Sequence, residues 1–389
     1  MVTQATVRIF VTTSHISCVY MTLFARSTRQ VGGKDILLVD IGTRSNALIA
    51  VILKTATLHE WTFVKSFSEG VGDRHHFQPS LLKRLTRQWK ELTFVRPAYA
   101  LLLARYERAR DKRLGSELKK LLDPHIDGTA RLEVFGHTQT HLDKLLVKLD
   151  PSARTSFFEH GLGDYHYIEQ NGRLQGPLHA LFADSFSSFL VRKGIPSDQV
   201  LPLSISVDFP SFADQQMTDL LPKGSDHHHI PFDKPLVFIL LEAVDMYEVP
   251  HAFWPAYIDH VLSTLKDPAR FHFLLKPHPI SSEISIRATL DHCQRIGLSC
   301  SILDEPWQKS IAAEVMFAQW ADRTEHVFCL FSSACFYLSQ FYRNPRITYH
   351  YSTAFMNKWT SNAPPMYKRH FAALVPLIKE VFAERCKPY

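Results

Sequence analysis

Short, continuous apolar runs alternate with helix-like segments along the first half of the chain, and this alternation constrains the fold more than any other feature. Strands that are apolar at every position are typical of parallel sheets covered by helices on both faces. We therefore predict helices over 15–29, 46–55 and most of 80–123, and strands at Val7–Val11, Ile36–Ile41, Trp61–Val64, Arg131–Phe135 and Thr155–Phe158.

The second half of the chain repeats this pattern. It predicts helices over 251–266, 284–296, 308–320, 333–342 and 367–384, and strands at Leu236–Leu241, Phe271–Leu275, Cys300–Leu303 and His326–Leu330. Residues 206–234, which are rich in Pro, Asp and Ser, are interpreted as a linker between the halves. The sequence therefore predicts an α/β protein in which two Rossmann-like domains, residues 1–205 and 235–389, face a cleft.

Positive charge is concentrated in one helical region of the first predicted domain. The net charge is +6, and twelve Lys/Arg but only four Asp/Glu lie between Lys83 and Lys120. Such a region either binds a polyanion, a phosphate or an acidic membrane surface, or forms a solvated helix face. No basic motif interleaved with aromatic residues accompanies it, so a nucleic-acid partner is not expected.

The cysteines and the N-terminal stretch indicate a cellular compartment. Six cysteines without a C-x-x-C pair are typical of reduced, buried thiols in the cytosol. No apolar run reaches the ~20 residues of a membrane span, and the N-terminal stretch lacks a secretory cleavage site. We expect a cytoplasmic protein, either free or attached to the inner face of the cell membrane.

Several common cofactor motifs are absent from the sequence. It has no G-x-G-x-x-G after a strand and no G-x-x-x-x-G-K-[ST], which disfavours a dinucleotide dehydrogenase or a P-loop nucleotidase. It has no His or Cys set at zinc spacing, and the run His227–His229 is better interpreted as a solvated part of the linker than as a metal site.

Three polar motifs follow predicted strands, at the end where open α/β sheets bind ligands. The first is Glu159-His160-Gly161, in which a carboxylate or an imidazole can accept a proton beside a glycine turn. The second, Lys276-Pro277-His278-Pro279, holds a His and a Lys on a rigid loop, where they can neutralise or protonate a phosphate leaving group. The third, Ser332-Ser333, opens a helix and is either a phosphate site or a simple helix cap.

The order of these motifs resembles that in the bacterial sialyltransferases and polysialyltransferases of the two-Rossmann (GT-B) class. That family carries an acidic pair followed by Gly, then His-Pro, then Ser-Ser or Ser-Thr. The counterparts in this sequence are Glu159-His160-Gly161, His278-Pro279 and Ser332-Ser333. The opening is also similar, because Thr12-Thr13-Ser14-His15 stands between a strand and a helix.

The resemblance implies an inverting transferase that moves sialic acid from a CMP-activated donor to a glycan acceptor, with no metal or other cofactor. It implies a base in the first motif and a role for His278 at the departing phosphate. It also implies that the C-terminal domain binds the nucleotide sugar through Lys276, Pro279, Glu314, Ser332 and Ser333, and that Gly161 and His15 lie in acceptor-side turns. If the enzyme extends a polysialic acid or a capsule polysaccharide, the basic region would hold its polyanionic acceptor.

One departure from the family pattern leaves alternatives open. The second acidic residue is replaced by His160, so that either Glu159 or His160 serves as the base. Transferases of the teichoic-acid type carry His-Gly at this point and use a CDP-linked polyol phosphate. Such a polymer transferase is one alternative, and a non-catalytic nucleotide- or glycan-binding relative is another.

Overall fold

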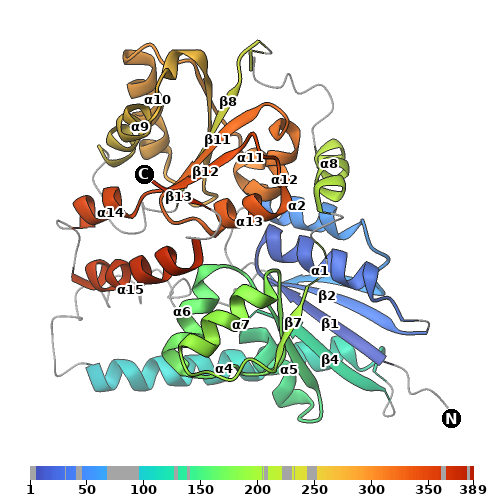
Figure 1. The fold of residues 1–389 in the computed structure, drawn as a ribbon. Helices are drawn as coiled ribbons and strands as arrows, with labels where there is room; N and C mark the ends of the chain where they lie inside the picture. Colours follow the sequence, from blue (N-terminus) through green and yellow to red (C-terminus); the bar gives the residue numbers. More distant parts are fainter. Residues whose placement is uncertain are drawn as a thin grey trace. The chain divides into compact units, whose positions relative to one another are not determined.

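Two parallel sheets organise the chain, as seen in a computed structural model (Figure 1). The structure describes residues 6–30, 32–40, 46–67, 96–126, 130–137, 141–203, 205, 209–220, 230–231, 233–242, 252–360, 365–382 and 386–389. The chain separates into two units, of which the first comprises Met1–Glu159 and Gln175–His179 and the second comprises His160–Leu174 and Ala180–Tyr389.

The first sheet has the strand order β3-β2-β1-β4-β5-β6-β7. Its strands are β1 (Thr6–Thr12), β2 (Lys34–Asp40), β3 (Phe63–Phe67), β4 (Arg131–Gly136), β5 (Arg154–Phe158), β6 (Leu178–Ala180) and β7 (Val200–Pro202). The pairings of β1 with β2 and β4, of β2 with β3, of β4 with β5 and of β5 with β6 are parallel. The carboxyl ends of these parallel strands, which carry candidate site residues, therefore lie on the same side of the sheet.

The second sheet has the order β10-β9-β8-β11-β12-β13. Its strands are β8 (Leu236–Leu241), β9 (His272–Pro277), β10 (Cys300–Ile302), β11 (Thr324–Cys329), β12 (Thr348–Tyr351) and β13 (Lys387–Pro388). All six residues of β8 and all six of β9 are buried. These strands thus have both faces covered, as their continuous apolar sequence predicts.

Helices follow most of the strands in both parts of the chain. In the first unit they are α1 (His15–Ser27), α2 (Asn46–Ala56), α4 (Arg96–Leu122) and α5 (His141–Leu149). In the second unit they are α6 (Leu162–Asn171), α7 (Ala183–Arg192), α8 (Phe209–Leu220), α9 (Phe253–Thr264), α10 (Glu283–Arg295), α11 (Pro306–Ser310), α12 (Ala313–Met316), α13 (Ser333–Phe341), α14 (Thr353–Thr360) and α15 (Pro365–Phe382). The predicted fold class, two Rossmann-like α/β domains, is confirmed.

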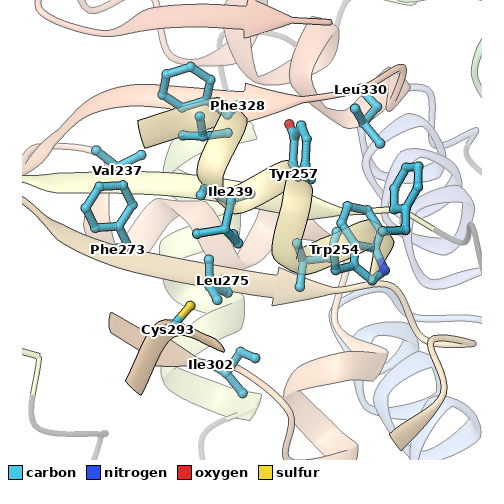
Figure 2. Packing of buried hydrophobic residues seen from close by; sticks show 14 of the residues in the cluster. Val237, Ile239, Trp254, Tyr257, Phe273, Leu275, Cys293, Ile302, Phe328 and Leu330 are labelled. Carbon is cyan, nitrogen blue, oxygen red and sulfur yellow. The ribbon is translucent and has the colours of Figure 1, made fainter. Parts of the chain in front are cut away.

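Figure 2 shows the apolar core around the second sheet. Ile239 of β8, Leu275 of β9 and Phe328 of β11 belong to this core together with Trp254 and Tyr257 of α9. All five side chains are at most 2% exposed. Burial of side chains of this size contributes roughly 1.5–3 kcal/mol each, so the core fixes the strands whose ends carry the second and third motifs.

Several elements differ from the sequence-based prediction. Strands β6, β7, β12 and β13 were not predicted, because runs of two to four residues are too short to show a period. The single helix predicted over 308–320 is broken, since Ile311 and Ala312 have extended backbones with ψ of 136° and 140°.

The segment predicted to be a linker contains helix α8. This helix buries Phe209 and Met217, and the Phe209 ring stacks on Phe341 of α13 with ring centroids 3.8 Å apart. Part of residues 206–234 therefore packs within the second unit. The run His227–His229 lies outside the described residues.

The basic region is described only in part. Residues 83–95 lie outside the described residues, and 96–120 belong to α4. Leu114, Leu118 and Leu122 of α4 are buried in the core of the first unit. Basic side chains are exposed along the same half of the helix, at Arg108, Lys112, Arg113, Lys119 and Lys120. This half of α4 is therefore amphipathic, with a basic outer surface.

The six cysteines are free thiols, and all except Cys300 are buried. Burial raises the pKa of Cys18 to about 12 and that of Cys329 to about 11. A hydrogen bond from the Cys293 thiol lowers the pKa of Cys300 and raises that of Cys293. The burial of five of the six thiols agrees with the expectation from the sequence.

His179 of β6 lies in an aromatic cluster of the first unit and supports the start of the first motif. Its ring stacks on Phe158 at 5.4 Å and lies 4.8 Å from Phe24, both measured between centroids. Its carbonyl oxygen accepts the N–H of Glu159 at 2.9 Å. Burial lowers the pKa of His179 to about 4.

This lowered pKa predicts a loss of stability in acid. Between pH 6.5 and about 4 the unfolded chain binds a proton at residue 179 that the folded chain does not bind. The contribution of neutral His179 to the free energy of unfolding is therefore fully present above pH 6.5 and is lost as the pH falls toward 4. We expect His179→Phe to lose less free energy of unfolding on acidification than the wild type, by up to about 3 kcal/mol. Urea denaturation near pH 7.5 and near pH 4 measures this, with the half-buried His125→Phe as the control. Equal losses in the His179 variant and the wild type would contradict the assignment.

Candidate functional site

The first motif forms the turn between β5 and α6. Glu159, at the end of β5, is completely buried, whereas His160 is only half-buried. The His160 N–H donates to the Asp164 carboxylate at 2.5 Å. Asp164 is itself 2% exposed and lies in the first turn of α6, where the helix dipole favours a negative charge. The sequence analysis did not single out Asp164, which holds the backbone of this turn.

Gly161 brings the first motif into contact with the third. A Cβ atom at this position would lie 2.7 Å from Ser333 Oγ and 3.2 Å from Ser333 Cβ. Its φ of +135° is also a conformation that L-residues rarely adopt. Only glycine therefore allows the turn before α6 to approach the start of α13 this closely, and two motifs far apart in sequence meet within the second unit.

The third motif forms the turn between β11 and α13. Ser332 is the N-cap of α13, and its hydroxyl oxygen accepts the Ala334 N–H at 3.3 Å. The Ser333 hydroxyl has no hydrogen-bond partner among the described residues. Backbone N–H groups and a positive dipole end at a helix start favour anions. The arrangement therefore combines a helix cap at Ser332 with a hydroxyl at Ser333 that is available to a ligand.

The second motif follows β9. His278 is exposed, and its N–H donates to the Leu241 carbonyl at 2.9 Å. Its Nδ1 atom accepts the Ile280 N–H at 3.3 Å, which assigns the proton of the neutral ring to Nε2. Pro279 is also exposed and restricts the backbone between these two contacts. His278 is therefore exposed just beyond the end of β9, on backbone that is held by a hydrogen bond to β8.

Lys276 and Glu314 lie inside the second unit, at 4% and 5% exposure. The Lys276 ammonium donates to the carbonyls of Pro277 at 2.9 Å and Lys309 at 3.1 Å. Burial lowers the pKa of Lys276 to about 7, and the charge of Glu314 opposes this shift. Burial raises the pKa of Glu314 to about 7, and the charge of Lys276 opposes that shift. The Lys276 ammonium group thus links the end of β9 to α11, and the charges of Lys276 and Glu314 stabilise each other.

His15, the first residue of α1, is 2% exposed. Its Nε2 atom lies 2.9 Å from Thr55 Oγ1, so it joins α1 to α2 in the first unit.

Another histidine, His137, follows β4 directly and was missed by the sequence analysis. Its Nε2 atom lies 2.7 Å from Thr13 Oγ1, and both residues are at most 9% exposed. The signal in the sequence was a His immediately after the apolar run that ends at Gly136.

Neither a metal cluster nor a membrane span is found in the described part of the chain. There, no group of three or more His, Cys, Asp or Glu could hold a metal ion. Within the same residues, no helix is long and apolar enough to cross a membrane.

Comparison with known proteins supports the fold. No protein-family model and no curated protein matches the chain. A Staphylococcus aureus MnaA–UDP co-structure is 10% identical, with a TM-score of 0.50 over 87% of this chain and 77% of that one. A putative UDP-N-acetylglucosamine 2-epimerase from Listeria monocytogenes is 9% identical, with a TM-score of 0.50 over 98% and 92% of the two chains. A glycosyltransferase from Rickettsia africae is 10% identical, with a TM-score of 0.46 over 99% and 93%. The two matches with a TM-score of 0.50, together with the two parallel sheets, show that the chain has the two-domain GT-B type of fold.

The contact of Gly161 with Ser333 can be tested by substitution. We expect Gly161→Ala to lower the free energy of unfolding by about 2–4 kcal/mol, from backbone strain and steric overlap together. Gly172→Ala, at the other end of α6, is the matched control, since φ there is +65° and no atom lies within 4 Å of the added methyl group. It should cost only about 1–2 kcal/mol.

A second substitution distinguishes the two costs of Gly161→Ala, which are the steric overlap with Ser333 and the backbone strain at residue 161. Ser333→Gly removes both atoms that the new methyl group would meet, so it should restore part of the stability of Gly161→Ala in a double-mutant cycle. Strictly additive effects, measured by thermal or urea denaturation, would show that residues 161 and 333 are not in contact.

Proposed function

We propose that this protein is an inverting, metal-independent glycosyltransferase that moves sialic acid from a CMP-activated donor to a glycan acceptor. The observation that carries the proposal is the approach of Gly161 to Ser333, because it joins a motif with a candidate base to a motif with a candidate phosphate site. The GT-B type of fold is compatible with a nucleotide-sugar substrate, and the order of the three motifs supports CMP-sialic acid as the donor.

We assign the general base to His160. Its ring is half-buried and so remains accessible, whereas the Glu159 carboxyl group is completely buried. The hydrogen bond from the His160 N–H to Asp164 fixes the backbone that carries this ring. Glu159 would then support His160 from the interior.

The reaction is a single displacement. His160 takes the proton of the acceptor hydroxyl while the acceptor oxygen attacks the anomeric carbon. The bond from that carbon to the phosphate oxygen of CMP breaks, and its electron pair stays on the phosphate. His278, through Nε2–H, and the hydroxyl groups of Ser332 and Ser333 donate hydrogen bonds where this negative charge develops.

A second candidate is a polymer transferase of the teichoic-acid type with a CDP-linked donor. The accessible imidazole at position 160 favours it, because that class carries His-Gly at this point. Thermal shifts with CMP, CDP and UDP separate the two, since a nucleotide that binds the folded protein raises its melting temperature.

The exposed basic side chains of α4 suit an acceptor or a surface of negative charge. We propose that they hold a polyanionic glycan acceptor. In a cytoplasmic enzyme the same residues could also contact the anionic inner face of the cell membrane.

The donor assignment predicts turnover of CMP-sialic acid. Activity should be unchanged by EDTA, and His278→Ala should lower kcat by about 10²–10⁴-fold, because it removes a donor to the leaving phosphate. His125→Ala, a half-buried histidine outside the three motifs, is the control and should keep full activity. Near-full activity of His278→Ala with the true donor would contradict this mechanism.

The base assignment predicts which substitution removes the acidic limb of the pH–rate profile. A base must be deprotonated, so kcat/KM should fall on acidification, and an ordinary imidazole titrates near 6.5 whereas an ordinary Glu titrates near 4.3. We expect His160→Gln to lower kcat by at least about 10²-fold and to abolish the limb. Glu159→Gln should keep the limb with a smaller loss of rate. A limb that survives in His160→Gln and disappears in Glu159→Gln would assign the base to Glu159.

A further inference from the structure

Glu242 follows β8 directly and is 6% exposed, but no motif drew attention to it. One of its carboxyl oxygens, Oε1, accepts three backbone N–H groups, from Leu330 at 2.8 Å, Phe331 at 2.9 Å and Ser332 at 2.9 Å. Its other oxygen, Oε2, is buried and has no hydrogen-bond partner among the described residues. These three N–H donors belong to the loop that leads into α13, so Glu242 holds the third motif by its backbone.

The position of β8 in the sheet links Glu242 to the second motif as well. β8 lies between β9, which ends at Pro277 just before His278, and β11, which leads to Ser332. The residue before Glu242, Leu241, accepts the His278 N–H at 2.9 Å through its carbonyl. Adjacent strands lie about 4.8 Å apart, so the loops after β9 and β11 start roughly 10 Å from each other across β8. Two consecutive residues at one strand end thus anchor both loops.

The geometry of these bonds explains why a side chain of this length serves here. Three backbone N–H groups converge on the single oxygen Oε1, so one acceptor held at this distance satisfies all three. Burial raises the pKa of Glu242 to about 7, and the three N–H groups oppose this shift because they favour the carboxylate. An uncharged acceptor of the same length could still satisfy the N–H groups, whereas a shorter side chain could not reach all three.

We propose that Glu242 is a positioning residue of the donor site, which sets the spacing between the His278 loop and the Ser332-Ser333 loop so that both contact one phosphate group. The inference rests on the proposed function, in which these loops bind the leaving group. Glu242 acts through the loop backbone and does not itself contact the donor.

Two conservative variants distinguish the effect of the length of the Glu242 side chain from the effect of its charge. Glu242→Gln keeps the length and one acceptor oxygen but removes the charge, and Glu242→Asp keeps the charge but shortens the side chain by one methylene. We expect Glu242→Asp to weaken CMP binding by about tenfold or more and to raise KM for the donor, because hydrogen bonds from the three N–H groups are lost. Glu242→Gln should stay within about threefold of the wild type, and KM for the acceptor should change in neither variant. Glu283→Asp, at an exposed position in the first turn of α10, is the matched control.

The wild type is tested first with CMP, CDP and UDP by calorimetry, and the nucleotide that binds is then used for all variants. Binding of none of them would refute the proposed function, and this inference with it. If the wild type binds a nucleotide and Glu242→Asp binds it equally well, only the role of Glu242 is refuted. A larger loss in Glu242→Gln than in Glu242→Asp also refutes it, since charge and not reach would then matter. Hydrogen exchange at the amides of residues 330–332, without ligand, provides an independent readout and should accelerate in Glu242→Asp only.

Discussion

The structure depends on strands that are buried along their whole length. Every residue of β8 and β9 is buried, and β8 pairs with β9 along its whole length. Exposed polar side chains are therefore found mainly beyond the strand ends. Glu242 and His137 follow a strand directly, the second motif begins at the end of β9, and Ser332 follows β11 after two further residues.

Buried carboxylates shape the loops at these strand ends. Asp164 holds the turn that carries His160, and Glu242 holds the turn that carries Ser332. Both turns take part in the contact between Gly161 and Ser333. The side chains of His160 and Ser332 are thus attached to backbone that buried carboxylates hold in place. Such hydrogen bonds keep the geometry of a site when no ligand is bound.

The fold and the motifs could be predicted because each depends on a local pattern. A continuous apolar run identifies a buried strand, and a polar residue after it marks a strand end. Strands β6, β7, β12 and β13 were beyond this reasoning, since their short runs show no detectable period. Glu242 was missed for another reason. On its own it resembles a solvated residue after a strand, and its partners lie 88 to 90 positions further along the chain. Glu314 illustrates the same limit, because a Glu in a short helix is usually exposed and this one is buried.

The buried thiols make the protein well suited to site-directed labelling. Reagents such as maleimides react with accessible thiolates, and burial keeps most of these thiols both inaccessible and protonated. Cys300 differs, because it is partly exposed and its pKa is lowered. The variant Cys300→Ser should therefore react little with such reagents. One cysteine introduced on each unit of this variant could then be labelled with a fluorophore, and energy transfer between the two labels would report motion between the units during turnover.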